Sequence, residues 1–196
     1  MRLSVIESSL KFHQRIIVFF IKRKFGVFPG PIAVMTYRKR WFGAHYAKWL
    51  NETMHKSEHW TRVEMELMAT YVSRANACSY CHSIHERIAN VGAGADLVEQ
   101  VMNNLEAAPI SAQLKALLPF LEKITKHPDA VSKEDFATML NEGLSHDAIE
   151  EALHIMASFN IINRLMDAFG YEPISERGNP AAFIWKQGYG ITSLPG

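Results

Sequence analysis

The chain has 196 residues, of which 48% are hydrophobic and 21% are charged, and its net charge is +1. This composition fits one globular domain with a sizeable core and excludes a disordered chain. A net charge so close to zero gives no overall electrostatic footprint for nucleic acid, so we expect no such partner. Only two cysteines are present. The chain is therefore not a secreted disulfide scaffold, and we expect it to be cytoplasmic, where any disulfide is transient.

Helical periodicity runs through nearly the whole chain, and no alternation of period two is long enough to predict a strand. We therefore predict an all-α fold, a single-domain helical bundle at 25–170 with an N-terminal helical arm at 1–24 and an irregular C-terminal tail at 171–196. In chain order, helices are expected at about 4–24, beyond the Pro- and Gly-containing break 25–32, and at 62–75, 77–90, 96–105, 111–126 and 146–169, with a further start at Ser132.

Capping residues mark several of these helix ends. Asp96 with Glu99 and Ser132 with Asp135 have the spacing of a capping box, which predicts a helix start at each pair. Gly92 and Gly94 are expected to end the helix that carries the cysteines.

The N-terminal arm contains an apolar run, Ile16–Ile21, followed by three basic residues. The run is far shorter than the roughly 18 residues that span a bilayer, and no signal-peptide cleavage site follows it. Lys11, Arg15 and Lys22 form a basic stripe suited to a membrane surface. The run itself is apolar on every side, which favours burial. We therefore expect no membrane association and predict that the arm packs against a neighbouring subunit.

The two cysteines, Cys78 and Cys81, lie three residues apart, and His85 follows four residues later. On a helix these positions share one face. Backbone N–H groups at a helix N-terminus lower the pKa of a thiol, and His85 is placed to accept the proton of Cys81. A thiolate attacks the O–O bond of a peroxide, and a second thiol such as Cys78 can then close a disulfide that an external reductant reopens.

Other interpretations of these residues stay open at this point. Two buried cysteines beside a histidine can be structural. Cys78-Ser-Tyr-Cys81-His82 fits the attachment pattern of c-type haem, although no export signal accompanies it. A zinc site would add further ligands to the two thiols, from His82 or His85 together with His55 or His59. We expect neither a metal nor a bound cofactor.

The stretch from Glu66 to His85 resembles the core motif of the alkylhydroperoxidase D-like branch of the carboxymuconolactone decarboxylase family. That motif is a Glu twelve residues before a Cys-x-x-Cys and a His four residues after the second Cys. All four positions match, at Glu66, Cys78, Cys81 and His85. The similarity covers roughly 25–170 and includes Phe159-Asn160-x-x-Asn163-Arg164, Asp167–Gly170 and the Pro-containing stretch Val27–Pro31.

The resemblance implies an all-α protein that assembles as a homo-trimer or homo-hexamer. It implies that Cys81 attacks the peroxide, that Cys78 resolves the sulfenic acid, that His85 shuttles the proton and that Glu66 is the base behind His85. It also implies a hydroperoxide substrate and an external dithiol reductant, either a lipoyl-bearing or a thioredoxin-like protein.

The chain departs from the family pattern at Tyr80, because the best-known members carry a histidine immediately before the second Cys. A phenol has a pKa near 10, so Tyr80 is a predicted site residue that donates a hydrogen bond but is a poor base at neutral pH. His82 cannot replace that histidine, because on a helix it points about 100° away from Cys81.

Together these features predict a peroxiredoxin-type enzyme that reduces organic hydroperoxides or hydrogen peroxide through a Cys81 sulfenate and a Cys78–Cys81 disulfide. The alternative is a redox sensor or thiol-disulfide oxidoreductase with little peroxide turnover. Lactone decarboxylation, which names the family, is disfavoured because that branch typically lacks the Cys-x-x-Cys. A structural oligomer with a vestigial site stays open because of Tyr80.

Overall fold

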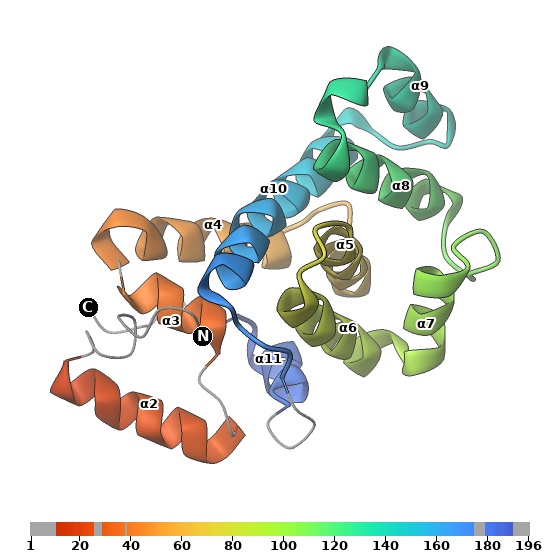
Figure 1. The fold of residues 1–196 in the computed structure, drawn as a ribbon. Coiled ribbons are helices and arrows are strands. Elements are labelled where there is room, and N and C mark those ends of the chain that lie inside the picture. Colours follow the sequence, from red (N-terminus) through yellow and green to blue (C-terminus); the bar gives the residue numbers. More distant parts are fainter. Residues whose placement is uncertain (1–10, 26–28, 38, 175–178, 190–196) are drawn as a thin grey trace.

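The computed structural model describes residues 11–25, 29–37, 39–174 and 179–189, and these form helices without a strand (Figure 1). The protein is all-α, as predicted. The elements are α2 (Phe12–Phe25), α3 (Gly30–Tyr37), the π-helical turn η1 (Lys39–Gly43), α4 (Ala44–His55), α5 (Arg62–Ala75), α6 (Ser79–Ala93), α7 (Ala95–Asn103), α8 (Ala112–Lys126), the 3₁₀ turn η2 (Pro128–Ala130), α9 (Lys133–Asn141), α10 (His146–Phe169) and α11 (Ala181–Gln187).

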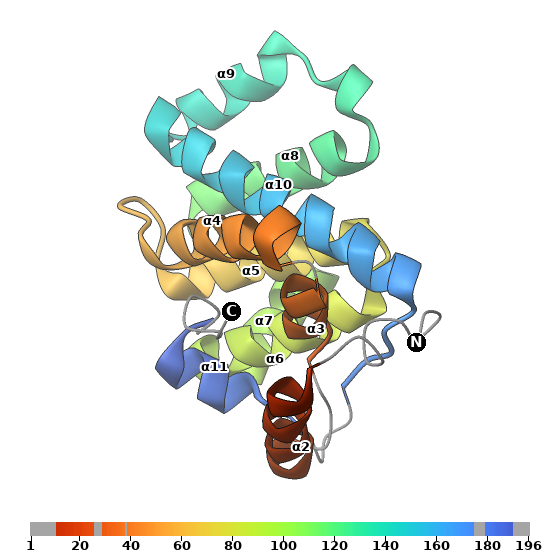
Figure 2. The same cartoon turned by 90° about the vertical axis from the view of Figure 1, so that its left-hand side faces the viewer.

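Helices α5 and α10 form the centre of the bundle. Every residue of α5 from Met65 to Ser73 is buried, and α5 packs against α4, α6, α8 and α10. The long helix α10 crosses the molecule and also contacts α3, α4 and α8, whereas α2 and α9 lie at opposite ends (Figures 1 and 2). A helix buried on all sides must satisfy its polar side chains internally. The hydrogen-bond partners of the buried polar residues on α5 therefore show which other elements must meet that helix.

The predicted boundaries of α5 and α10 are confirmed, and local capping explains both. Thr61 accepts the backbone N–H of Glu64, and the Glu64 carboxylate accepts the N–H of Thr61 at 2.9 Å, which is a capping box. Ser145 accepts the N–H of Ala148 at 3.0 Å, and Gly170 ends α10 in the left-handed conformation. The predicted capping box at Ser132 is also confirmed.

Other expected boundaries are wrong. Helix α7 begins after Gly94 without a side-chain cap, so the Asp96–Glu99 capping box does not form. Gly94 is the C-cap of α6, as expected, but Gly92 lies inside the helix, which ends at Ala93. The tail is not wholly irregular, because residues 181–187 form α11, which packs against α6. Packing against the bundle stabilises a helix that the Gly- and Pro-rich composition of the tail does not predict.

The helix expected after the Pro- and Gly-containing break is interrupted. It is divided into α3, η1 and α4; η1 continues directly into α4 at Gly43, and both pack against α3. A Cβ on Gly43 would lie 1.8 Å from the carbonyl oxygen of Met35, so no other residue fits there without moving the backbone. The glycine thus permits the close approach of two helices that a continuous helix would not make.

The N-terminal arm is described from residue 11, and the first part of the predicted helix 4–24 lies outside the described residues. Phe12, Phe19 and Phe20 on α2 are largely exposed. No helix within the described ranges is long and apolar enough to cross a bilayer. The packing of the arm against a second subunit stays a prediction, as does the division of the chain into an arm at 1–24, a bundle at 25–170 and a tail at 171–196.

We expect Gly43→Ala to lower the free energy of unfolding by about 3 kcal/mol or more, because the backbone of α3 cannot yield as a flexible side chain would. Urea denaturation followed by circular dichroism measures this. Gly94→Ala is the matched control. It has a φ of 86° and a ψ of 148° but no atom within 4 Å of its Cβ, so it should lose about 1–3 kcal/mol from backbone strain alone. Equal losses in the two variants would contradict the close contact with Met35.

Candidate active site

Both cysteines lie at the start of α6 and both thiols are free. Ala77 has a positive φ of 56°, which reverses the chain between α5 and α6. The N–H of Cys78 then donates to the carbonyl of Ser73 at 3.0 Å. Cys78 is the N-cap residue of α6 and Cys81 lies in its first turn. The cysteine helix therefore begins and ends slightly later than the predicted range 77–90.

The sequence predicts that the helix N-terminus lowers the pKa of the thiols, but the structure surrounds both thiols with apolar core. Cys78 is 0% exposed and Cys81 is 2% exposed. Burial raises the pKa of the Cys81 thiol well above its usual value, and the adjacent Cys78 thiol and the Asp167 carboxylate raise it further. A helix N-terminus favours a nearby anion by only about 0.3–1 kcal/mol, whereas burying an unpaired charge costs more. The Cys81 thiol is therefore protonated at neutral pH.

A buried carboxylate faces the cysteine helix from α5. Glu66 is 0% exposed, and its Oε2 lies 2.8 Å from Nδ1 of His85 on α6. Its Oε1 accepts a hydrogen bond of 2.7 Å from the hydroxyl of Tyr189, and that hydroxyl lies 3.1 Å from the same Nδ1. Glu66, His85 and Tyr189 thus form a closed cluster in which each polar group meets the other two.

This cluster fixes the protonation pattern of the imidazole. With Glu66 as a carboxylate, both of its neighbours must donate to it, so Nδ1 of His85 carries a hydrogen and Nε2 carries the lone pair. Nε2 is then the nitrogen that can take a proton from another group. His85 lies one helical turn after Cys81, and the ring of Phe159 meets the imidazole edge-on with centroids 4.5 Å apart.

The sequence did not reveal Tyr189, which lies in a segment expected to be irregular and stands 104 residues after His85. Burial raises the pKa of its phenol well above 10, and the Glu66 carboxylate raises it further. The hydroxyl therefore stays protonated and donates. No local motif surrounds Tyr189, so only the packing of α11 could have placed it beside Glu66.

Tyr80, the residue that departs from the family pattern, points elsewhere. Its buried hydroxyl accepts the backbone N–H of Gly30 at 3.0 Å, and its ring lies against Tyr171 with centroids 5.8 Å apart. Burial raises the pKa of this phenol. Tyr80 therefore ties the start of α3 to α6, and its described hydrogen bond leads away from the Glu66–His85 pair.

Asn163 and Arg164 have structural contacts. The buried Asn163 accepts the hydroxyl of Ser73 at 3.3 Å and so joins α10 to α5. Arg164 is exposed and donates to the backbone and side-chain oxygens of Asn160, one turn earlier. Both residues therefore have structural contacts and neither contacts the Glu66–His85 pair through a described hydrogen bond.

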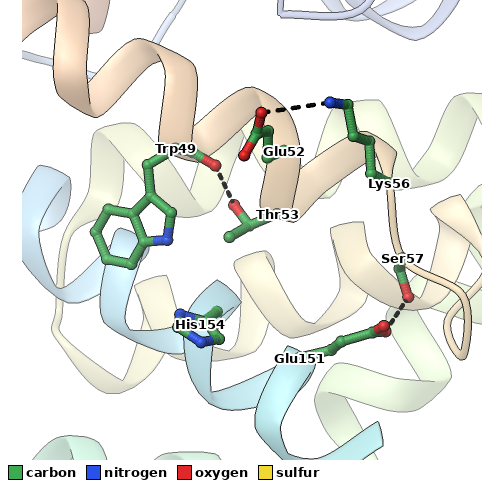
Figure 3. Close-up of a pocket in the computed structure, with 7 residues that line it drawn as sticks. All are labelled: Trp49, Glu52, Thr53, Lys56, Ser57, Glu151 and His154. Carbon is green, nitrogen blue, oxygen red and sulfur yellow. Dashed lines mark hydrogen bonds and ion pairs between the residues drawn. The ribbon is translucent and has the colours of Figure 1, made fainter. Parts of the chain in front are cut away.

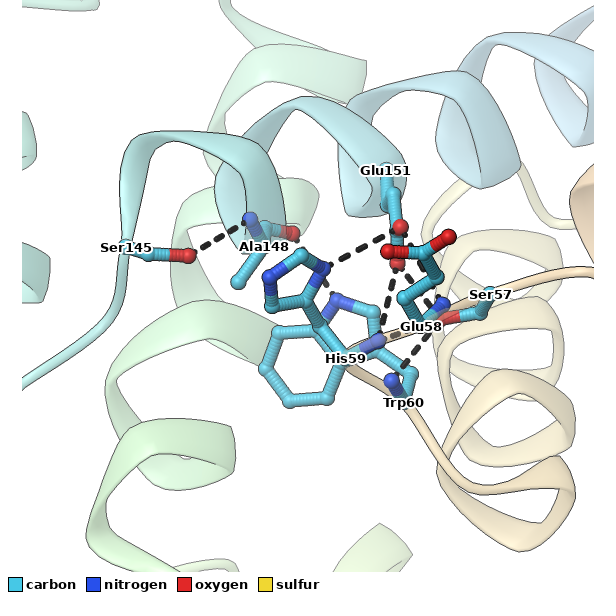
Figure 4. Close-up of polar contacts among 7 residues, drawn as sticks. All are labelled: Ser57, Glu58, His59, Trp60, Ser145, Ala148 and Glu151. Carbon is cyan, nitrogen blue, oxygen red and sulfur yellow. Dashed lines mark hydrogen bonds and ion pairs between the residues drawn. The ribbon is translucent and has the colours of Figure 1, made fainter.

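A second polar cluster fixes the loop that leads into α5 (Figure 4). Glu151 on α10 accepts the Ser57 hydroxyl at 2.5 Å and Nδ1 of His59 at 3.1 Å. Although burial opposes it, the hydrogen bond from Ser57 and that from His59 lower the pKa of Glu151. The indole of Trp60 donates to the carbonyl of Ala148 at 2.8 Å. This cluster fixes the start of α5 and therefore also the position of Glu66 in the core.

An open pocket of about 340 Å³ lies beside this loop, between α4 and α10 (Figure 3). Its wall contains Trp49, Glu52, Thr53, Lys56, Ser57, Glu151 and His154, and neither cysteine. In the part of the chain that the structure describes, no three His, Cys, Asp or Glu side chains gather as ligands of a metal would. His59 is paired with Glu151, and His55 lies against the ring of Tyr189.

Solved structures of other proteins share this helical arrangement. An uncharacterised peroxidase-related protein from Silicibacter sp. TM1040 superposes with a TM-score of 0.71 at 21% identity, covering 86% of this chain and 88% of that one. The alkylhydroperoxidase AhpD core of an uncharacterised peroxidase-related protein from Ralstonia eutropha JMP134 gives 0.69 at 23%, covering 87% and 90%. The chain has the alkylhydroperoxidase D fold.

The debrominase Bmp8 is a further protein with the alkylhydroperoxidase D fold found here. Its two structures superpose with a TM-score of 0.71 at 18% and 19% identity, covering 89% and 88% of this chain and 94% and 93% of that one, and the first of them contains 2,3,4-tribromopyrrole. No family model and no curated protein matches the sequence. Proteins with this fold therefore include a debrominase beside peroxidase-related proteins, and the chemistry of this chain must be argued from its own site.

The raised pKa of Cys81 predicts that the protein loses stability at alkaline pH. An unfolded cysteine ionises near pH 8.5, so above that pH the unfolded state releases a proton that the folded thiol keeps. We expect the free energy of unfolding to fall by up to about 1.4 kcal/mol per pH unit. Urea unfolding under reducing conditions at pH 7.5, 8.5 and 9.5 measures the slope.

Cys81→Ser is the control, because it removes this thiol and should flatten the slope. The buried tyrosines come into play only above about pH 10. Identical slopes in wild type and variant would show that burial of Cys81 does not set its ionisation.

Proposed function

We propose that the chain belongs to the alkylhydroperoxidase D-like family and is a cysteine peroxidase. The observation that carries the proposal is a buried Glu66–His85 pair one helical turn from a free, buried dithiol. A protonated thiol in an apolar site needs an adjacent base to become a nucleophile. The pair is that base. The fold supports the same conclusion, because two proteins that share it are described as peroxidase-related.

In the proposed reaction the Cys81 thiol passes its proton to Nε2 of His85, and the thiolate attacks one oxygen of the hydroperoxide. The O–O bond breaks, Cys81 becomes a sulfenic acid, and the alkoxide leaves as the alcohol with the proton returned by His85. Glu66 stabilises the imidazolium during this transfer. The Cys78 thiol then attacks the sulfenic sulfur, water leaves, and the Cys78–Cys81 disulfide forms.

An external dithiol must supply two electrons to reopen that disulfide. Two cysteines in direct contact suit a dithiol reductant such as a lipoyl group or a thioredoxin-like protein. We also propose a homo-trimer or homo-hexamer, in which the exposed phenylalanines of α2 provide an apolar contact surface.

The test is the consumption of tert-butyl hydroperoxide with dihydrolipoamide as reductant. We expect turnover in wild type and none in Cys81→Ser. Cys78→Ser should react once and stop at a sulfenic acid, which a 1,3-diketone probe traps for mass spectrometry. If wild type forms the disulfide after one equivalent but does not turn over with any dithiol, the chain is a redox sensor. Turnover of a brominated pyrrole instead of the peroxide would also contradict a peroxidase.

His85→Gln is expected to lower kcat/KM by about a hundredfold or more, since it removes the proton acceptor. The matched control is His82→Gln on the same helix. His82 is partly exposed and lies 3.3 Å from the Thr70 carbonyl and 4.0 Å from Glu86, outside the Glu66 cluster. Equal rates for the two variants would remove His85 from the proton transfer.

A further inference from the structure

The C-terminal segment Asn179–Tyr189 crosses back over α6 and places its last described side chain on Glu66. We propose that this segment is a built part of the active site and that Tyr189 is a positioning residue for the Glu66–His85 pair. The inference rests on the proposed function, since it assigns a role within the same proton relay. Three observations carry it: how the segment is anchored, how the chain turns at Gly188, and what the Tyr189 hydroxyl does to the carboxylate.

The first anchor is Arg62, at the start of α5. Its guanidinium donates to the carbonyl of Trp185 at 2.6 Å and to that of Ile184 at 2.8 Å, and it lies 4.7 Å from the Trp185 ring centroid. These carbonyls are at the C-terminal end of α11, where a cation is favoured, and that of Ile184 also accepts the N–H of Gly188. Arg62 thus caps α11 and fixes the ring of Trp185 at the same time.

The second anchor is Gly92, two turns beyond His85 on α6. A Cβ at this position would lie 2.2 Å from Cη2 of Trp185, so the indole occupies the space that any other residue would fill. Trp185 is thereby held between Arg62 and the backbone of α6. This contact explains why a glycine stands inside α6 rather than at its end.

Gly188 turns the chain inward after α11. Its φ is 73°, its N–H donates to the carbonyl of Ile184 at 2.8 Å, and a Cβ there would lie 2.8 Å from Nε2 of His55. The turn brings the ring of Tyr189 between two imidazoles, with centroids 5.4 Å from His55 and 5.8 Å from His85. The position of Tyr189 is therefore fixed by the backbone and by packing.

The hydroxyl of Tyr189 donates the second hydrogen bond to the buried carboxylate of Glu66. Glu66 is fully buried, and among the described residues its carboxylate has two donors, Nδ1–H of His85 on Oε2 and the hydroxyl of Tyr189 on Oε1. Hydrogen bonds to a carboxylate stabilise its charged form. Without the hydroxyl, the Glu66–His85 pair would bind a proton more tightly, so at a given low pH a larger fraction of His85 would already be protonated and unable to accept the proton of Cys81.

The other titratable and charged groups that face the Glu66–His85–Tyr189 cluster come from two helices. They are His55 and Tyr46 on α4 and Arg62 on α5. Arg62 is a fixed positive charge at every pH of the experiment. Tyr189→Phe leaves all of these groups in place, so a shift in the pH profile of this variant reports the lost hydroxyl.

The experiment compares kcat and KM of wild type and Tyr189→Phe between pH 5 and 9. We expect the acid limb of the profile to move up by about one pH unit, so that kcat falls about tenfold on that limb, with KM unchanged and the plateau at higher pH retained. Activity is lost on that limb as the pair takes up a proton, so tighter proton binding moves the loss to higher pH. Tyr46→Phe, which loses a hydroxyl bonded to the Ser158 carbonyl instead, should leave the limb in place.

The anchors are tested by glycine variants two residues apart. Gly92→Ala should displace Trp185 and reproduce the shift of Tyr189→Phe, whereas Gly94→Ala, where a Cβ meets nothing within 4 Å, should not. A wild-type profile in Tyr189→Phe would overturn the inference. So would equal profiles in the two glycine variants.

Failure of the proposed function is recognised separately. If wild type reduces no peroxide, the role of Tyr189 is read from the titration of the ¹⁵N-labelled His85 ring by NMR. A higher His85 pKa in Tyr189→Phe than in wild type would uphold the positioning role without any peroxidase activity. An unchanged His85 titration would refute that role.

Discussion

A single buried charge organises this molecule. Glu66 is fully enclosed on the central helix, where an uncompensated carboxylate would cost several kcal/mol. Its two donors come from α6 and from the segment after α11, so helices that are far apart in the sequence must meet at one point. The Glu151 cluster, by fixing the loop before α5, sets where that charge lies (Figure 4).

The apolar surroundings that require Glu66 to have hydrogen-bond donors also disfavour the charged form of the two thiols. Burial holds Cys81 in its protonated form, although the N-terminus of α6 favours an anion there. A fully enclosed dithiol is protected from indiscriminate oxidation, since reactivity follows thiolate character and exposure. Its activation then depends on a base within the enclosure. The buried Glu66–His85 pair and the buried dithiol are therefore two halves of one electrostatic arrangement.

The sequence predicts those features that local chemistry determines. The ends of α5 and α10 follow from Thr61, Ser145 and Gly170, and the convergence of Glu66 with His85 was implied by the motif. Tyr189 could not be predicted, because it meets Glu66 through the packing of α11, and no periodicity marks that short helix. Gly92 was wrongly expected to end α6 for a related reason, since its contact with the Trp185 ring arises only from tertiary packing.

The two tyrosines near the site show why a family pattern is not transferred position by position. Tyr80 stands where the family pattern that the sequence resembles has a histidine, yet its hydroxyl holds the backbone of Gly30. The phenol that reaches the carboxylate is Tyr189, from the other end of the chain. A buried Glu–His pair needs a second donor wherever one can be packed, and the sequence position of that donor is free. The change at Tyr80 therefore does not leave the pair incomplete.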